Sequence, residues 1–149
     1  MLSIVQEARE KRDLWKLCKE GKLTDVRSLL ACGKDVNSKN SYGETALMYA
    51  VWKKHNSIVK LLLDQPAVDV NVKSNDGWTA LYLAAGHNNA EGARMLLLHK
   101  DFNSANVTDN KGRTALICAV RHRKEEVLRE LVEHQCVSLD VGSLEGDQR

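Results

Sequence analysis

An all-α solenoid of stacked helix–turn–helix units is the fold that the sequence predicts, and three observations support it. The motif Gly-x-Thr-Ala-Leu occurs three times, at intervals of 34 and 35 residues, starting at Gly43, Gly77 and Gly112. An asparagine stands eight residues before the threonine of each motif, at Asn37, Asn71 and Asn106. The composition is 43% hydrophobic but only 5% aromatic, which suits a thin core of aliphatic residues and alanine. Because these features recur in step, the chain is a tandem repeat.

The threonine of each motif is suited to begin a helix, because its hydroxyl can accept a hydrogen bond from a free backbone amide. In the second unit the predicted helix covers residues 45–54, TALMYAVWKK, and small apolar residues on one face allow another helix to approach closely. Equivalent helices are predicted at residues 79–86, TALYLAAG, and 114–122, TALICAVRH.

A second helix is predicted at residues 57–65, SIVKLLLDQ, because its apolar residues form the broad stripe of a half-buried helix. Pro66 ends it. The following residues 68–77, VDVNVKSNDG, alternate in character and finish on a turn signal. Each unit is therefore a helix, a tight turn, a second helix and a hairpin-like loop, and second helices recur at residues 90–98 and 125–134.

The segments GWTALYLAA, EGARMLL and GKLTDVRSLLACGKDVN resemble the ankyrin repeat, with its G-x-T-P-L-H-x-A-A helix, leucine-rich second helix and D-V-N ending. The resemblance implies a repeat domain at residues 14–141, with units at 14–37, 38–71, 72–106 and 107–141. Residues 1–13 are expected to form an N-terminal extension or capping helix. Residues 142–149 are expected to form a C-terminal tail or the start of a fifth repeat, in which case the natural protein continues.

The sequence departs from the family pattern in three columns. The family's proline is replaced by Ala46, Ala80 and Ala115. The family's histidine is replaced by Met48, Tyr82 and Ile117, so the hydrogen bonds that it usually makes between repeats are expected to be absent. The glycine between the two helices survives only as Gly21, and its place is taken later by Lys54, Asn88 and Arg123. Of these three replacements only asparagine suits a left-handed conformation.

Composition and motifs argue against catalysis, cofactors and nucleic acid. No histidine belongs to a nucleophile or metalloprotease motif, and there is no phosphate-binding glycine loop. The four cysteines form no C-x-x-C pair and are expected to be free thiols. A net charge of +2 is too small for a nucleic-acid or membrane partner. We expect no enzyme, no cofactor and no metal, but a monomeric cytoplasmic protein, with the nucleus as the alternative location.

The resemblance implies a concave groove for a partner protein, formed by loop tips and by the ends of the first helices. Tyrosine, tryptophan and arginine dominate the binding energy of many interfaces, and several fall in these variable columns. The predicted partner-binding residues are Tyr42, Glu44, Trp52, Lys53, Asp76, Trp78, His87, Lys111, Arg113, Arg121 and His122. The aromatic side chains could instead fill space between repeats.

A protein-interaction module acting as an adaptor, scaffold or inhibitor is therefore the predicted function. The alternative is the target-recognition segment of a larger multidomain protein.

Overall fold

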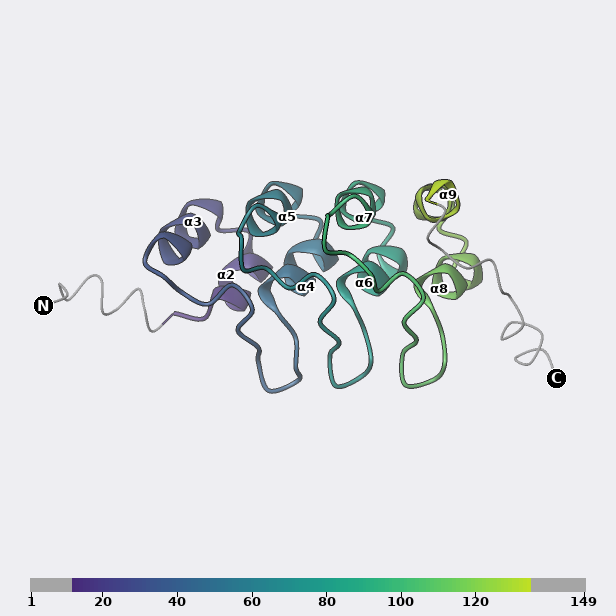
Figure 1. The fold of residues 1–149 in the computed structure, drawn as a ribbon, viewed down its shortest axis with the longest axis horizontal. Helices are drawn as coiled ribbons and strands as arrows, with labels where there is room; N and C mark the ends of the chain where they lie inside the picture. The colour runs from purple at the N-terminus through teal and green to yellow at the C-terminus, as the bar shows by residue number, and fades with distance from the viewer. Residues whose placement is uncertain (1–11, 135–149) are drawn as a thin grey trace, which may run out of the picture.

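The computed structural model describes residues 12–134, which form two layers of helices and three long loops (Figure 1). One layer contains the first helix of each repeat: α2 (Leu14–Glu20), α4 (Ala46–Trp52), α6 (Ala80–Gly86) and α8 (Ala115–Arg121). The other contains the second helices: α3 (Leu23–Ala31), α5 (Asn56–Leu63), α7 (Ala90–Leu97) and α9 (Glu125–Glu133). The predicted all-α repeat fold is confirmed, and the described residues contain no strand beyond an isolated bridge between Lys39 and Thr45.

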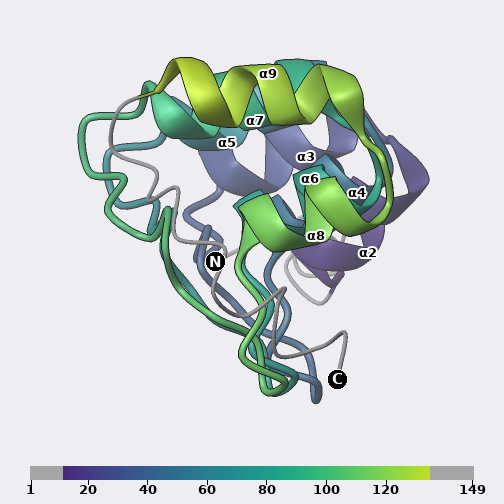
Figure 2. The same ribbon diagram turned by 90° about the vertical axis from the view of Figure 1, so that its right-hand side faces the viewer.

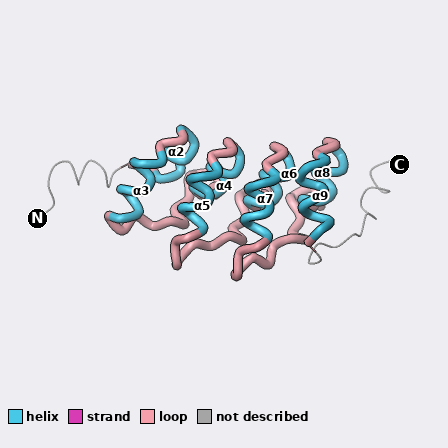
Figure 3. The backbone as a smooth tube through the Cα atoms, turned by 90° about the horizontal axis from the view of Figure 1, so that it is seen from above, coloured by secondary structure: helices cyan, strands magenta, loops and turns pink. Residues whose placement is uncertain are grey.

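The helix pairs succeed one another along a single axis, as Figure 3 shows from above. In the first layer α4 packs between α2 and α6, and α6 packs between α4 and α8. In the second layer α5 packs between α3 and α7, and α7 between α5 and α9. Seen along that axis in Figure 2, the loops extend away from the helices on the side of α4, α6 and α8. The angle between the loops and the first helices makes the concave side of the molecule.

The threonine of each motif caps its helix as predicted. The hydroxyls of Thr45, Thr79 and Thr114 accept hydrogen bonds from backbone amides three residues later, at 3.4, 3.1 and 3.2 Å. Asp13 precedes α2 without a side-chain cap. The capped helices therefore begin at the alanine after each threonine, which fixes the side that each helix turns toward the core.

All four turns between paired helices adopt a left-handed conformation, whether or not glycine is present. The φ angle is 75° at Gly21, 60° at Lys54, 55° at Asn88 and 54° at Arg123. In each case the following amide donates back to a carbonyl of the preceding helix; His55, for example, donates to Ala50 at 2.9 Å. The helix pair thus keeps its tight turn even where lysine or arginine is strained by it.

The core is continuous along the stack and is built from leucine, valine, isoleucine and alanine. Leu14, Val26, Leu62, Leu81 and Leu96 are among its fully buried side chains. Val68 and Phe102 follow the second helices of the second and third units. Val68 is buried in this core, and Phe102 packs against it. This aliphatic core agrees with the low aromatic content of the sequence, which provides few aromatic side chains for the interior.

Asparagine side chains form hydrogen bonds between successive repeats. Asn37 donates to the carbonyl of Ala67 at 2.7 Å and accepts from the amide of Asp69 at 2.8 Å. Asn71 repeats the pattern one unit later, with Asp101 at 2.8 Å and Asn103 at 3.0 Å. The conserved spacing of the asparagine column within this chain therefore has a structural cause.

The predictions for the two ends of the chain fall largely outside the described residues. The extension or capping helix at residues 1–13 is described only at Arg12 and Asp13, and Arg12 forms an ion pair with Asp25 at 3.3 Å. The tail or fifth repeat at residues 142–149 lies wholly outside them, as does Cys136. Within the described part, Cys18, Cys32 and Cys118 are free thiols.

Candidate functional site

A pocket of about 490 Å³ lies on the concave side, between the loops and the ends of the first helices. Its lining comes from three repeats: Glu44 and Trp52 from the second, Trp78 to His87 from the third, and Cys118 to Lys124 from the fourth. The lining residues are Glu44, Trp52, Trp78, Tyr82, Leu83, Gly86, His87, Cys118, His122 and Lys124. We call this cavity the groove pocket. Its size is in the range of roughly 300–1,000 Å³ that is usual for ligand sites.

One wall of the groove pocket belongs to a row of aromatic rings that crosses three repeats. Ring centroids lie 5.4 Å apart between Trp15 and Tyr49, 5.6 Å between Tyr49 and Trp52, and 5.5 Å between Trp52 and His87. The ammonium group of Lys53 lies 4.4 Å from the centroid of the Trp52 ring. Trp52 thus both packs on its neighbours and presents a half-buried face to the pocket.

Trp78 and Tyr82 form the facing wall. Their rings are nearly parallel, with an interplanar angle of 6° and centroids 6.3 Å apart. The Tyr82 hydroxyl donates to Asp109 in the loop of the next repeat, at 2.9 Å. This bond corrects the expectation that hydrogen bonds from the histidine column would be absent, because tyrosine in that column supplies one. Burial, with the nearby Asp109 carboxylate, raises the pKa of Tyr82.

Asp109 is the buried anchor of this wall. Its carboxylate accepts from the backbone amides of Lys111 and Arg113, both at 2.9 Å, and from Tyr82. Burial by itself would raise the pKa of Asp109, but these hydrogen bonds and the Arg113 guanidinium lower it below its usual value. The carboxylate therefore stays charged and holds the loop against α6.

The Glu44 side chain is turned inward rather than offered to a partner. Its Oε2 accepts a short hydrogen bond from the Tyr49 hydroxyl and another from Asn40 at 2.9 Å. Burial and this carboxylate raise the pKa of Tyr49 to about 12. Glu44 thus lines the groove pocket, but its charge is already solvated by two donors of its own repeat.

A second cavity of about 210 Å³ adjoins the groove pocket between two loop tips. Asp76, Trp78, Lys111 and Arg113 line it together with Asp109 and Asn110. Arg113 folds back toward Asp109, with 3.4 Å between its Nε and a carboxylate oxygen, and keeps only 23% of its side chain exposed. Trp78 lines both cavities.

The structure brings most of the predicted residues together and leaves three outside. Glu44, Trp52, Trp78, His87 and His122 line the groove pocket, while Asp76, Lys111 and Arg113 line the adjoining cavity. The Lys53 ammonium lies over the Trp52 ring. Tyr42 is 65% exposed at a loop tip, and exposed Arg121 ends α8; neither lines these two cavities.

The site prediction missed Tyr82, Leu83, Cys118 and Lys124 in the lining of the groove pocket. Tyr82 and Cys118 lie within first helices, whereas the site prediction covers the loop tips and the ends of these helices. A polar hydroxyl in a column otherwise filled by Met48 and Ile117 was the available signal for Tyr82. Burial raises the pKa of the Cys118 thiol, so this sulfur is part of an apolar wall rather than a nucleophile.

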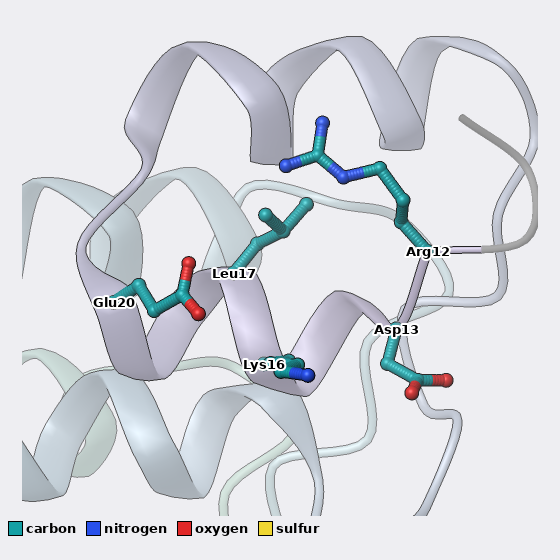
Figure 4. A pocket seen from close by; sticks show the side chains of 5 residues that line it. All are labelled: Arg12, Asp13, Lys16, Leu17 and Glu20. Atoms are coloured by element: carbon teal, nitrogen blue, oxygen red, sulfur yellow. The ribbon is translucent and has the colours of Figure 1, made fainter. Parts of the chain in front are cut away.

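Three further cavities are lined mainly by polar or mixed residues. One, of about 370 Å³, lies between the first and second repeats and includes Gly21, Lys54 and His55. Arg12, Asp13, Lys16, Leu17 and Glu20 surround another of about 330 Å³ at the start of the stack, seen from close by in Figure 4. Arg12 is the first residue that the structure describes. The third lies on the outer layer between α5 and α7, with a volume of about 470 Å³, and includes Met95 and Leu98.

The described residues contain neither a metal-binding cluster nor a membrane-spanning helix. From residue 12 to residue 134, no three His, Cys, Asp or Glu side chains are grouped as a metal site would require. None of the helices in that range is long and apolar enough to span a bilayer.

These features agree with comparisons to known proteins, by which the chain belongs to the ankyrin-repeat family. A family model described as ankyrin repeats in three copies matches residues 14–106 and 67–143. Repeats of this family generally mediate interaction between proteins and are typically non-catalytic.

Individual relatives match about half of the chain. An ankyrin repeat protein of Rickettsia bellii is 39% identical over 64 residues, which are 43% of this chain and 66% of that protein. Ankyrin repeat protein 14 of vaccinia virus is 39% identical over 79 residues, 52% of this chain and 33% of its own length. Mouse protein phosphatase 1 regulatory subunit 12A is 42% identical over 77 residues, 50% of this chain and 7% of its own length. The matches thus span about two thirds of the first relative and a third or less of the others.

Proposed function

We propose that this chain is a non-catalytic interaction module that holds a partner protein in the groove pocket and the adjoining cavity. Its role would be that of an adaptor, scaffold or inhibitor, acting as a monomer in the cytoplasm or nucleus. One observation carries the proposal. Two half-buried tryptophans, Trp52 and Trp78, line the same open cavity, although the helix core beneath them is already filled by aliphatic side chains.

The residue types of this surface support the proposal. Tryptophan and tyrosine that are held by their neighbours lose little further conformational freedom on binding, so they make efficient anchors. Trp52 is held by Tyr49 and His87, and Trp78 by its stacking on Tyr82. The loop carrying Trp78 is fixed in turn by backbone hydrogen bonds to both adjacent loops. A rigid surface of this kind is suited to binding a partner without rearrangement.

The alternative is that the repeats are the recognition segment of a larger protein. It is favoured by relatives such as the phosphatase regulatory subunit, in which the match covers 7% of the length. Both versions use the same groove pocket, and they differ in what the bound partner is delivered to.

Gly86 provides a test that separates binding from folding. It lines the groove pocket, and a Cβ added there would meet only the Cys118 sulfur, at 3.8 Å. Gly86→Leu should therefore narrow the pocket, and it should not weaken α6, because leucine favours helix more than glycine by roughly 0.8–1 kcal/mol. Leu98→Ser, at a side chain that is 68% exposed on the outer layer, is the matched control.

The experiment immobilises wild type, Gly86→Leu and Leu98→Ser and quantifies by mass spectrometry the proteins that each captures from cells of the source organism. We expect at least one protein that wild type and Leu98→Ser retain and Gly86→Leu loses. Trp78→Ala should weaken binding of the same protein by about 2 kcal/mol or more, as for an interface anchor. If folded Gly86→Leu captures the same proteins in the same amounts as wild type, the groove pocket is not the binding site.

A further inference from the structure

The two sides of the groove pocket differ in chemistry, and this difference narrows the kind of partner that would fit. Its walls are largely apolar, formed by Trp52, Trp78, Leu83 and Cys118 with the ring of Tyr82. A cavity of about 490 Å³ with such walls can hold one large apolar side chain and part of the backbone that carries it.

Basic side chains gather where the first helices end. They follow α4, α6 and α8 or precede α9, and comprise Lys53, Lys54, His87, His122 and Lys124. We call this set the basic rim. The positive charge of the basic rim acts on His87. Burial lowers the pKa of the His87 imidazole, and the ammonium groups of Lys53, Lys124 and Lys54 lower it further. Three positive charges therefore act on one edge of the pocket.

No carboxylate of the described residues neutralises the basic rim through an ion pair. The described ion pairs join Arg12 to Asp25, Arg94 to Glu130 and Arg113 to Asp109. Glu44, the acidic residue that lines the pocket, is bound by Tyr49 and Asn40. Glu125 and Glu126 follow Lys124 in the first turn of α9 and do not line the pocket.

We propose, on the basis of the proposed function, that the groove pocket binds an acidic peptide segment of the partner protein. One large apolar side chain of that segment enters between Trp52 and Trp78, and carboxylates on either side of it contact Lys53 and Lys124 of the basic rim. A carboxylate gains most where ammonium groups have no carboxylate partner of their own, and among the described ion pairs neither Lys53 nor Lys124 has one. A basic segment would meet the uncompensated positive charges and be repelled.

The test selects peptides from a random library displayed on phage, with the whole chain as bait, and measures the affinity of synthetic copies by fluorescence polarisation. Lys53→Glu/Lys124→Glu reverses two charges of the basic rim. Lys60→Glu/Lys100→Glu reverses two exposed lysines elsewhere, and so changes the net charge equally. Gly86→Leu reports whether a peptide uses the pocket.

The expected peptides carry carboxylates around one large apolar residue and lose affinity on Gly86→Leu. Reversal of the basic rim should weaken them roughly tenfold or more, and the control reversal about twofold or less, since distant surface charges are screened by salt. Peptides that need the pocket but are neutral or basic would overturn this inference and leave the proposed function standing. A selection without pocket-dependent peptides would also overturn it, while the proposed function is judged separately by the captured proteins.

Discussion

Single residues in left-handed turns show how far this chain departs from an idealised repeat. Lys54 and Arg123 occupy a conformation that costs a non-glycine residue roughly 1–2 kcal/mol. The fold tolerates the strain because the helices on either side are fixed by core packing. The sequence identified these positions, but it could not show that lysine and arginine would adopt the same φ as the glycine in the first repeat.

Lys54→Gly should therefore raise the free energy of unfolding by about 0.5–1 kcal/mol, because glycine reaches this φ without strain. Lys53→Gly is the control, since its φ is −84° and glycine there relieves no strain; it adds freedom to the unfolded chain and removes the ammonium group from the Trp52 ring, and both effects lower stability. Urea denaturation of both variants measures the effect. A loss of stability in Lys54→Gly equal to that in Lys53→Gly would show that the turn at residue 54 is not strained.

Tyr82→Phe should destabilise the protein at neutral pH by about 1–2 kcal/mol, because Asp109 loses a charge-assisted hydrogen bond. The folded pKa of Asp109 is depressed, so the stability that depends on its charge is present above the unfolded pKa of about 3.9 and is lost as the pH falls through the folded pKa. The difference between wild type and Tyr82→Phe should narrow on acidification. Denaturation at neutral and acidic pH measures it, and a constant difference would contradict this account.

At the scale of elements, the sequence predicted more of the structure than it did of the site. Threonine caps, paired helices and hairpin-like loops follow from local residue types, and each appears in the structure. The direction in which Glu44 and Arg113 turn could not be predicted, because it depends on the loop conformation that brings them to Tyr49 and Asp109, although these partners are only five and four residues away. Tyr82 was missed for a different reason, since its partner lies in the next repeat.

Contact between adjacent loops can be tested with two glycines that share a conformation. Gly77 and Gly33 have φ angles of 84° and 86°, so an alanine at either is strained by a similar amount. A Cβ at Gly77 would come within 2.8 Å of the backbone of Asp109 and Asn110, whereas a Cβ at Gly33 meets nothing within 4 Å. Gly33→Ala should cost about 1 kcal/mol and Gly77→Ala more than about 2 kcal/mol. Equal losses in thermal unfolding would mean that the loops do not press on one another.

At the scale of the whole molecule, stability arises from interfaces between neighbouring repeats. Each helix contacts its partner and its counterparts in the adjacent units, and ion pairs such as Arg94 with Glu130 cross from one unit to the next. A central repeat therefore supports two interfaces. In such stacks the total stability is close to a sum of repeat and neighbour contributions.

Leu81→Ala and Leu62→Ala should each lower the free energy of unfolding by about 2–5 kcal/mol, because both side chains are fully buried in central repeats and a cavity would remain. Leu98→Ala, at a side chain that is 68% exposed, should change it by less than about 0.5 kcal/mol. Chemical denaturation compares the three variants. Similar small losses in all of them would show that the central leucines are not part of the cooperative core.

The tips of adjacent loops are joined by two backbone hydrogen bonds that point the same way along the stack. The amide of Asn75 donates to the carbonyl of Tyr42, and one unit later the amide of Asn110 donates to that of Asp76. Since the donor and the acceptor occupy equivalent places in successive units, every unit is a template for its successor. If residues 72–106 were duplicated in tandem, the loop tips of the two copies could form the same hydrogen bonds at the new junction. Such a longer molecule would carry a second copy of the Trp78 wall, and thus two anchoring points in series from a single genetic event.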